Sequence, residues 1–82
     1  MSALADAEIG RRVRITRAEL EEDVAHWLAA VGLAAGEEVI VLRRAALGGP
    51  LHVRLASGGE FAIAREVAAQ IAVAPAGDEA AP

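Results

Sequence analysis

The first clear pattern along the chain is an alternation of apolar and charged residues near its start. In the stretch RRVRI, Val13 and Ile15 alternate with Arg12 and Arg14. Successive side chains of a β-strand point to opposite faces, so this alternation predicts a strand with one buried face. The residues before it show no clear period, and we treat residues 1–9 as a separate N-terminal segment.

The residues after this strand carry the signals of a helix. Thr16 is followed three residues later by Glu19, a spacing typical of a capping box that begins a helix at about Arg17. Gly32 is placed for a left-handed C-terminal cap, after which Leu33 folds back onto the last turn. The apolar stripe between these ends has helical spacing and consists of Leu20, Val24, Leu28 and Val31, with Trp27 beside it.

Short strands separated by glycine-rich corners make up the middle of the chain. Residues 39–44, VIVLRR, begin with an unbroken apolar run that has β-branched members, which suits a strand covered on both sides or curved into a barrel. Alternating residues at 51–55 and 61–63 predict two more strands. The glycines of GGP and SGGE, and Gly36 before the first of these strands, supply the tight turns.

The end of the chain completes the predicted topology. Residues 65–70 suffice for one or two helical turns, and residues 71–73 offer a last strand. We expect residues 75–82 to form a disordered tail, because they have little to bury. A helix after the first of about five short strands favours a mainly β protein, a small SH3-like barrel over residues 10–74.

Composition narrows the class of protein. At 82 residues the chain is one domain. It has no cysteine, which excludes disulfides and thiolate metal sites and fits a reducing compartment. No apolar run approaches the ~20 residues that a membrane-spanning helix needs, and no export signal begins the chain. We therefore expect a cytoplasmic protein without a membrane span, and the net charge of −4 argues against nucleic-acid binding.

Candidate metal chemistry is confined to the start of the predicted helix. Carboxylates and one imidazole share a helix face there, at Glu19, Glu22, Asp23 and His26. Oxygen and imidazole donors suit a divalent transition metal such as iron or zinc, so Glu22 and His26 are weak candidate ligands. A solvated face whose acids favour the helix N-terminus explains the same pattern.

The remaining polar residues do not suggest an enzyme. No pair of groups is arranged in the sequence as nucleophile and base, and the glycine-rich stretches lack the residues of a phosphate loop. We interpret His52 as a residue at the surface or rim of the domain. We interpret Arg43 and Arg44 as solvated side chains at the end of a strand. Trp27 has two readings, a core residue or an anchor for another protein.

The stretch WLAAVGLAAGEEVIVLRRAALGGPLHVRLASGGEFAIAREVAAQIAV resembles the FeoA family, ferrous iron transport protein A, in the order and spacing of its motifs. The resemblance covers about residues 10–73. The matching positions are Leu28, Gly32, Leu33, Gly36, Val39, Val41, Leu47, Gly48, Pro50, Val53, Ala62, Ile63, Arg65, Ile71 and Val73.

This resemblance implies an SH3-like barrel that supports ferrous iron import by binding the cytosolic part of FeoB, a membrane transporter with a G-protein domain. Its place would be the cytoplasm, at the inner face of the membrane through its partner. The expected contact is an apolar groove between the helix end and the following corner, formed by Trp27, Leu33, Leu47, Gly48 and Pro50. The alternative is a transition-metal-binding module similar to the C-terminal domain of iron-dependent repressors. Self-association is a further expectation.

Overall fold

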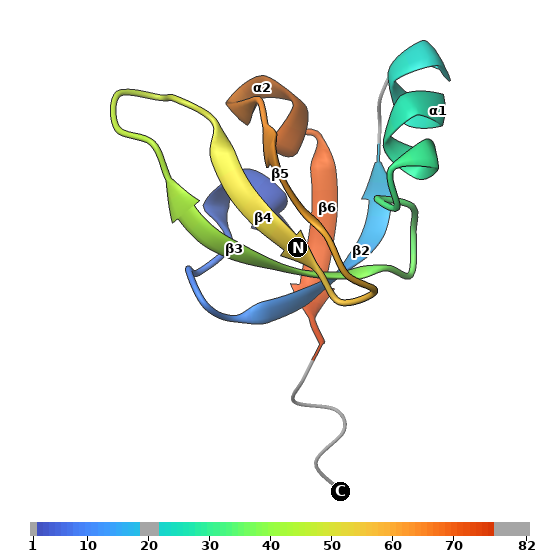
Figure 1. Ribbon diagram of the computed structural model, residues 1–82, viewed down its shortest axis with the longest axis horizontal. Helices are drawn as coiled ribbons and strands as arrows, with labels where there is room; N and C mark the ends of the chain where they lie inside the picture. The colour runs from blue at the N-terminus through green and yellow to red at the C-terminus, as the bar shows by residue number, and fades with distance from the viewer. Residues whose placement is uncertain (1, 19–21, 77–82) are drawn as a thin grey trace, which may run out of the picture.

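The computed structural model describes residues 2–18 and 22–76. Its elements are β1 (Ser2–Ala3), the 3-10 helix η1 (Leu4–Asp6), β2 (Arg12–Ala18), α1 (Glu22–Ala30), β3 (Glu38–Arg44), β4 (Leu51–Leu55), β5 (Glu60–Ile63), α2 (Arg65–Ala68) and β6 (Ile71–Pro75). The strands form one antiparallel sheet in the order β1-β6-β2-β3-β4-β5. Figure 1 shows the sheet curled on itself, with α1 and α2 at one end. The expected mainly β architecture is confirmed.

The core of the curled sheet is aliphatic, as the alternation along the strands predicts. Each fully buried Val, Leu or Ile side chain contributes about 1.5–3 kcal/mol relative to exposure, so this core is the main source of stability. The largest fully buried side chains are Leu4, Ile15, Leu28, Leu33, Leu51, Ile71, Val39, Val41 and Val53.

The predicted start of the first helix is wrong. Thr16 lies inside β2, at a bulge where the pairing with β6 shifts register, and its Oγ1 donates a hydrogen bond to the carbonyl oxygen of Ala72 at 3.1 Å. Arg17 also belongs to β2, whereas α1 is described from Glu22. Glu19 lies outside the described residues. This segment forms a strand in place of the predicted helix start because β6 pairs with it. Local residue spacing cannot reveal such a distant partner.

The N-terminal segment is part of the barrel and not a separate piece. β1 pairs with β6, and the side chain of Leu4 is fully buried. The guanidinium of Arg44 donates to the carbonyl oxygens of Ala5, at 2.9 Å, and Ala7. A two-residue strand is too short to show a period, so the sixth strand was missed.

The last strand also extends further toward the C-terminus than the sequence suggested. β6 includes Pro75, which pairs with Val13 of β2. Ala76 is buried, and its N–H donates to the carbonyl oxygen of Arg12 at 3.3 Å. The predicted tail at 75–82 therefore overlaps the last strand, and its residues 77–82 lie outside the described chain.

The C-terminal end of α1 has the geometry that the sequence predicted. Gly32 has a φ of 103° and its N–H donates to the carbonyl oxygen of Ala29 at 3.1 Å, while the N–H of Leu33 donates to that of Leu28 at 2.7 Å. This pair of bonds is a Schellman cap, and it turns Leu33 into the core. Gly36 forms the next turn with a φ of 95°.

Candidate partner-binding surface

Helix α1 presents its tryptophan to the outside. Leu28 faces the core, but Trp27 is 55% exposed and Val31, one turn later, lies at the surface beside it in the helical repeat. Of the two readings of Trp27, the structure supports the exposed one. An indole left half in water has apolar area to bury against another molecule, and such side chains are typical anchors of protein interfaces.

The hairpin between β3 and β4 holds a second apolar side chain in solvent. Leu47 and Gly48 both have positive φ, 61° and 75°, and the N–H of Gly49 donates to the carbonyl oxygen of Ala46 at 3.2 Å. These values describe a type I′ turn, which favours Asn-Gly and disfavours leucine. The Leu47 side chain is fully exposed. Leu47 is thus a large apolar residue with a strained backbone conformation whose side chain is not packed against the barrel.

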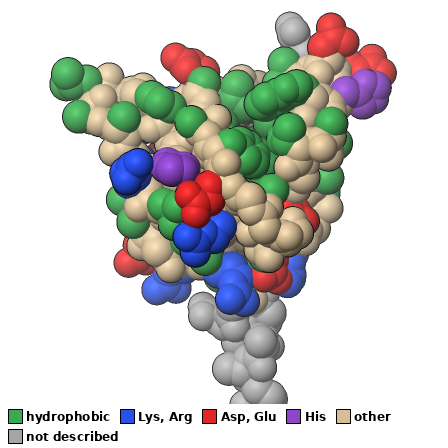
Figure 2. All heavy atoms as spheres, in the orientation of Figure 1, with side chains coloured by type: hydrophobic (Ala, Val, Ile, Leu, Met, Phe, Trp, Pro, Cys, Tyr) green, Lys and Arg blue, Asp and Glu red, His purple; other side chains and the backbone are tan. Residues whose placement is uncertain are grey.

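A shallow hollow of 250 Å³ opens at the base of this hairpin. The space-filling view in Figure 2 shows the outer face on which a histidine and basic and acidic side chains gather beside the apolar hairpin. The hollow is lined by Arg43, Ala45, Pro50, Leu51, His52 and Ala62. Pro50, expected at a partner contact, therefore borders this hollow.

The structure distributes the expected contact residues over two places. Trp27 lies on α1, and the hairpin carries Leu47, Gly48 and Pro50. The two elements lie on opposite sides of the same end of the barrel, with α2 between them in the view of Figure 1. Leu33 is only 1% exposed, so it holds the end of α1 against the core and is not at the surface.

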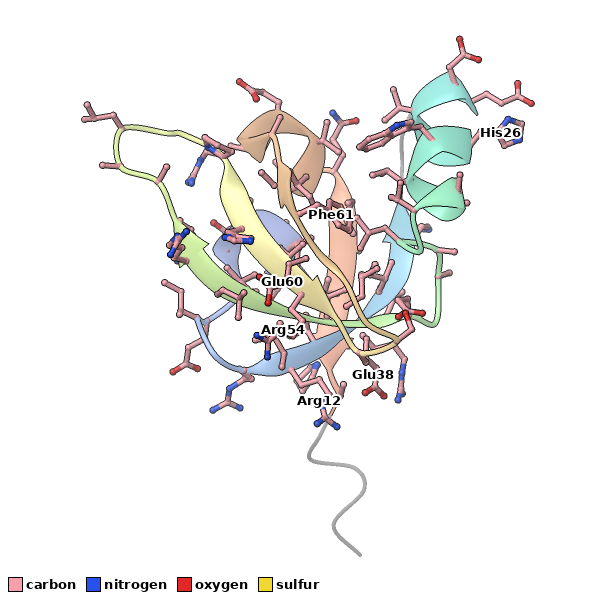
Figure 3. All side chains as sticks on the ribbon, viewed as in Figure 1. Arg12, His26, Glu38, Arg54, Glu60 and Phe61 are labelled. Atoms are coloured by element: carbon pink, nitrogen blue, oxygen red, sulfur yellow. The ribbon has the colours of Figure 1, made fainter. Side chains whose placement is uncertain are left out.

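Charged side chains lie next to the hollow on the same outer face of the sheet. Arg54 donates to Oε2 of Glu60 through Nε at 3.0 Å and Nη2 at 2.8 Å, and Nε2 of His52 lies 3.4 Å from Oε1 of Glu60. Figure 3 shows Arg54 and Glu60 side by side on this face. The hydrogen bond from Arg54 lowers the pKa of Glu60, and the charges of His52 and Arg43 act in the same direction.

The candidate metal ligands do not form a cluster. Glu22 and His26 are both exposed on α1, and His26 projects away from the barrel in Figure 3. Within residues 2–18 and 22–76, no three His, Asp or Glu side chains gather closely enough to hold a metal ion.

Sequence reasoning missed the cross-strand row that borders the hollow. Arg43 of β3 pairs with His52 of β4, and His52 pairs with Ala62 of β5. The alternation at 51–55 correctly placed His52 on the outer face. The partners across the strands depend on register, and a bulge between Val41 and Arg43 shifts that register.

The FeoA domain model matches residues 3–75, nearly all of the described chain. The chain belongs to the FeoA domain family. Members of this family are non-catalytic accessory domains of ferrous iron transport, so the expectation of a non-catalytic domain is confirmed. The match begins at Ala3, the second residue of β1, and includes η1, in agreement with the packing of this segment.

Solved structures confirm the FeoA-like, SH3-like fold. The FeoA protein from Chlorobium tepidum is 33% identical, with a TM-score of 0.82 over 98% of this chain and 76% of its own. Iron(II) transport protein A from Clostridium thermocellum is 25% identical, with a TM-score of 0.82 over 92% of this chain. This FeoA-family chain spans only 46% of the Clostridium protein.

A more distant likeness concerns the fold alone. A manganese-dependent transcriptional repressor in complex with manganese is 20% identical, with a TM-score of 0.81 over 90% of this chain and 36% of its own. A search of curated protein sequences finds no significant match. No helix in the described part of the chain is long and apolar enough to cross a membrane.

Proposed function

We propose that this FeoA-family protein is an accessory protein of ferrous iron uptake that binds the cytosolic region of an FeoB-type transporter. Its place is the cytoplasm, at the inner face of the membrane when bound. The observation that carries the proposal is the exposure of two large apolar side chains, Trp27 and Leu47, at one end of a family domain whose core is filled by other aliphatic side chains.

The two side chains suit binding for different reasons. Trp27 carries a large apolar area on a rigid helix, so its burial costs little conformational entropy. Leu47 is held outward by a turn whose backbone is already fixed, which also reduces the entropy lost on binding. Contacts that differ between two states of the transporter would shift the population of those states without chemistry in this domain.

The test is an amide NMR titration of labelled protein with the purified cytosolic G-protein region of the transporter. We expect saturable shifts around Trp27, Leu47 and Gly48. Trp27→Ala should weaken binding by about thirtyfold, as expected for an interface anchor, and should lower iron uptake in cells. Ile9→Ala is the matched control, because Ile9 is 50% exposed on the N-terminal segment and should leave both readouts unchanged.

Two results would contradict the proposal. One is saturable shifts confined to surfaces away from α1 and the hairpin. The other is unchanged iron uptake in variants that stay folded, Trp27→Ala and Leu47→Glu. Sedimentation of the protein alone reports self-association, the further expectation from the sequence, and separates it from binding to the transporter.

Binding of ferrous iron or zinc by Glu22 and His26 is a separate proposal with a separate test. Calorimetric titration with each metal alone should show a saturable site that His26→Ala removes, whereas His52→Ala, which changes the other histidine, should retain it. Weak, unsaturable binding would contradict this alternative and leave the transporter proposal unaffected.

A further inference from the structure

In the part of the chain that the structure describes, strand β5 forms one edge of the sheet. It ends the strand order and pairs only with β4 among the described strands. The N–H of Leu55 donates to the carbonyl oxygen of Gly59 at 3.0 Å, which sets the phase of the ladder. Ladder bonds alternate along an antiparallel pair, so the backbone N–H and C=O groups of Glu60 and Ala62 point outward from the sheet. These groups offer hydrogen bonds to a further strand.

The outer face beside this edge is shaped to take a side chain from such a strand. Arg43, His52 and Ala62 lie in one cross-strand row and together border the hollow at the base of the β3–β4 hairpin. Ala62 is the member of the row at the edge, and its small side chain leaves the hollow accessible from that side. A residue opposite Ala62 on an added strand would reach over it toward His52.

The charge of this face is opposite to that of the whole protein. The net charge of the chain is −4, but beside the hollow Arg43, Arg54 and His52 surround the carboxylate of Glu60. Arg54 already donates two hydrogen bonds to Glu60, which leaves Arg43 at the exposed rim of the hollow. An acidic side chain is therefore the complementary occupant.

We infer that the β5 edge and the hollow bind an extended segment of a partner protein that carries one acidic residue and adds to the sheet as a strand. Its acidic residue lies opposite Ala62 and its carboxylate points toward His52 and Arg43. Two residues away, the added strand lies opposite Glu60, where a second acidic residue would be repelled. The backbone supplies affinity and this register supplies specificity. The inference does not depend on the proposed transporter contact, which rests on Trp27 and Leu47.

The probe is a blocked heptapeptide of sequence TVTETVT, with TVTQTVT as its matched control. Amide NMR should show saturable shifts in β5 on addition of the first peptide, with slower hydrogen exchange at the amides of Glu60 and Ala62. The glutamine peptide should bind about threefold more weakly, because it lacks the charge that meets Arg43 at an exposed site. Arg43→Gln should abolish this difference between the two peptides.

A backbone variant tests strand addition itself. Ala62→Pro removes the outward N–H without removing a ladder bond to β4, and an edge strand tolerates proline. It should weaken peptide binding about three- to tenfold, the effect of one backbone hydrogen bond. If this variant fails to fold, the exchange rates of the Glu60 and Ala62 amides in the unmodified protein decide the question.

The inference is overturned by any of three results. These are no saturable shifts at about millimolar peptide, shifts located away from β5, or unchanged exchange at Glu60 and Ala62 in the bound state. None of them bears on the titration with the transporter region, whose readout is at Trp27 and Leu47.

Discussion

A Cβ atom placed on Gly32 would lie 2.8 Å from Cδ1 of Leu55, so the cap of α1 and the end of β4 meet so closely that a side chain at this position would require Leu55 to shift. Gly32 also has a φ of 103°, and Leu55 is buried. One position therefore ends the helix and sets its distance from the barrel. Because Trp27 lies on the same helix, this contact also positions the exposed indole.

Gly32→Ala should lower the free energy of unfolding by about 2–4 kcal/mol, because backbone strain and overpacking against Leu55 add. Gly36→Ala is the matched control. Gly36 has a similar φ of 95° but no atom within 4 Å of the added Cβ, so only the strain of about 1 kcal/mol should appear. Urea unfolding measures both, and equal losses in the two variants would show that the contact with Leu55 is unimportant.

Leu47→Asn should separate stability from binding. Asparagine tolerates the left-handed conformation at Leu47, so the free energy of unfolding should rise by about 0.5–1 kcal/mol. Affinity for the transporter region should fall, because the exposed apolar side chain is lost. Urea unfolding and the NMR titration measure the two effects on one variant. A loss of stability together with unchanged affinity would contradict both the strain and the contact.

Arg44→Gln should loosen the N-terminal segment. The guanidinium of Arg44 holds the carbonyl oxygens of Ala5 and Ala7, and hydrogen bonds from a charged group contribute about 1.5–3 kcal/mol. Hydrogen exchange at residues 2–9 should accelerate before that of β3 and β4. Arg43→Gln, at the exposed neighbouring position, should leave this exchange unchanged, and equal acceleration in the two variants would contradict the assigned role.

The hydrogen bond from Arg54 to Glu60 predicts that the free energy of unfolding decreases at acidic pH. Since it lowers the pKa of Glu60 in the folded protein, its contribution is fully present above the pKa of an unfolded glutamate and is lost as pH falls through the lowered folded pKa. Carboxyl carbon shifts in an NMR pH titration measure this pKa directly. Arg54→Gln should raise the pKa of Glu60 toward its ordinary value, and an unchanged value would assign the shift to another cause.

The elements with strong periodicity were predictable because their signals are local. The alternation in β4 correctly identified its buried face, and Gly32 with Leu33 marked the helix end. Of the predicted helical stripe, Leu28 is buried and Val24 is partly buried, whereas Val31 is exposed. Leu20 lies outside the described residues. The exposure of Trp27 was not decided by spacing, because a residue at the border of an apolar stripe belongs to the core or the surface according to what packs next to it.

The sequence by itself determined an aliphatic, mainly β domain with a helix after an early strand and glycine corners, and its motif order already indicated the FeoA family. Only the tertiary structure decided which segments pair. Thr16 became part of β2 because β6 lies beside it, and residues 2–3 became a strand for the same reason. The tertiary structure also brought Arg43, His52 and Ala62 into one row across three strands. Backbone pairing between distant segments is a non-local interaction, and no local pattern of side chains encodes its register.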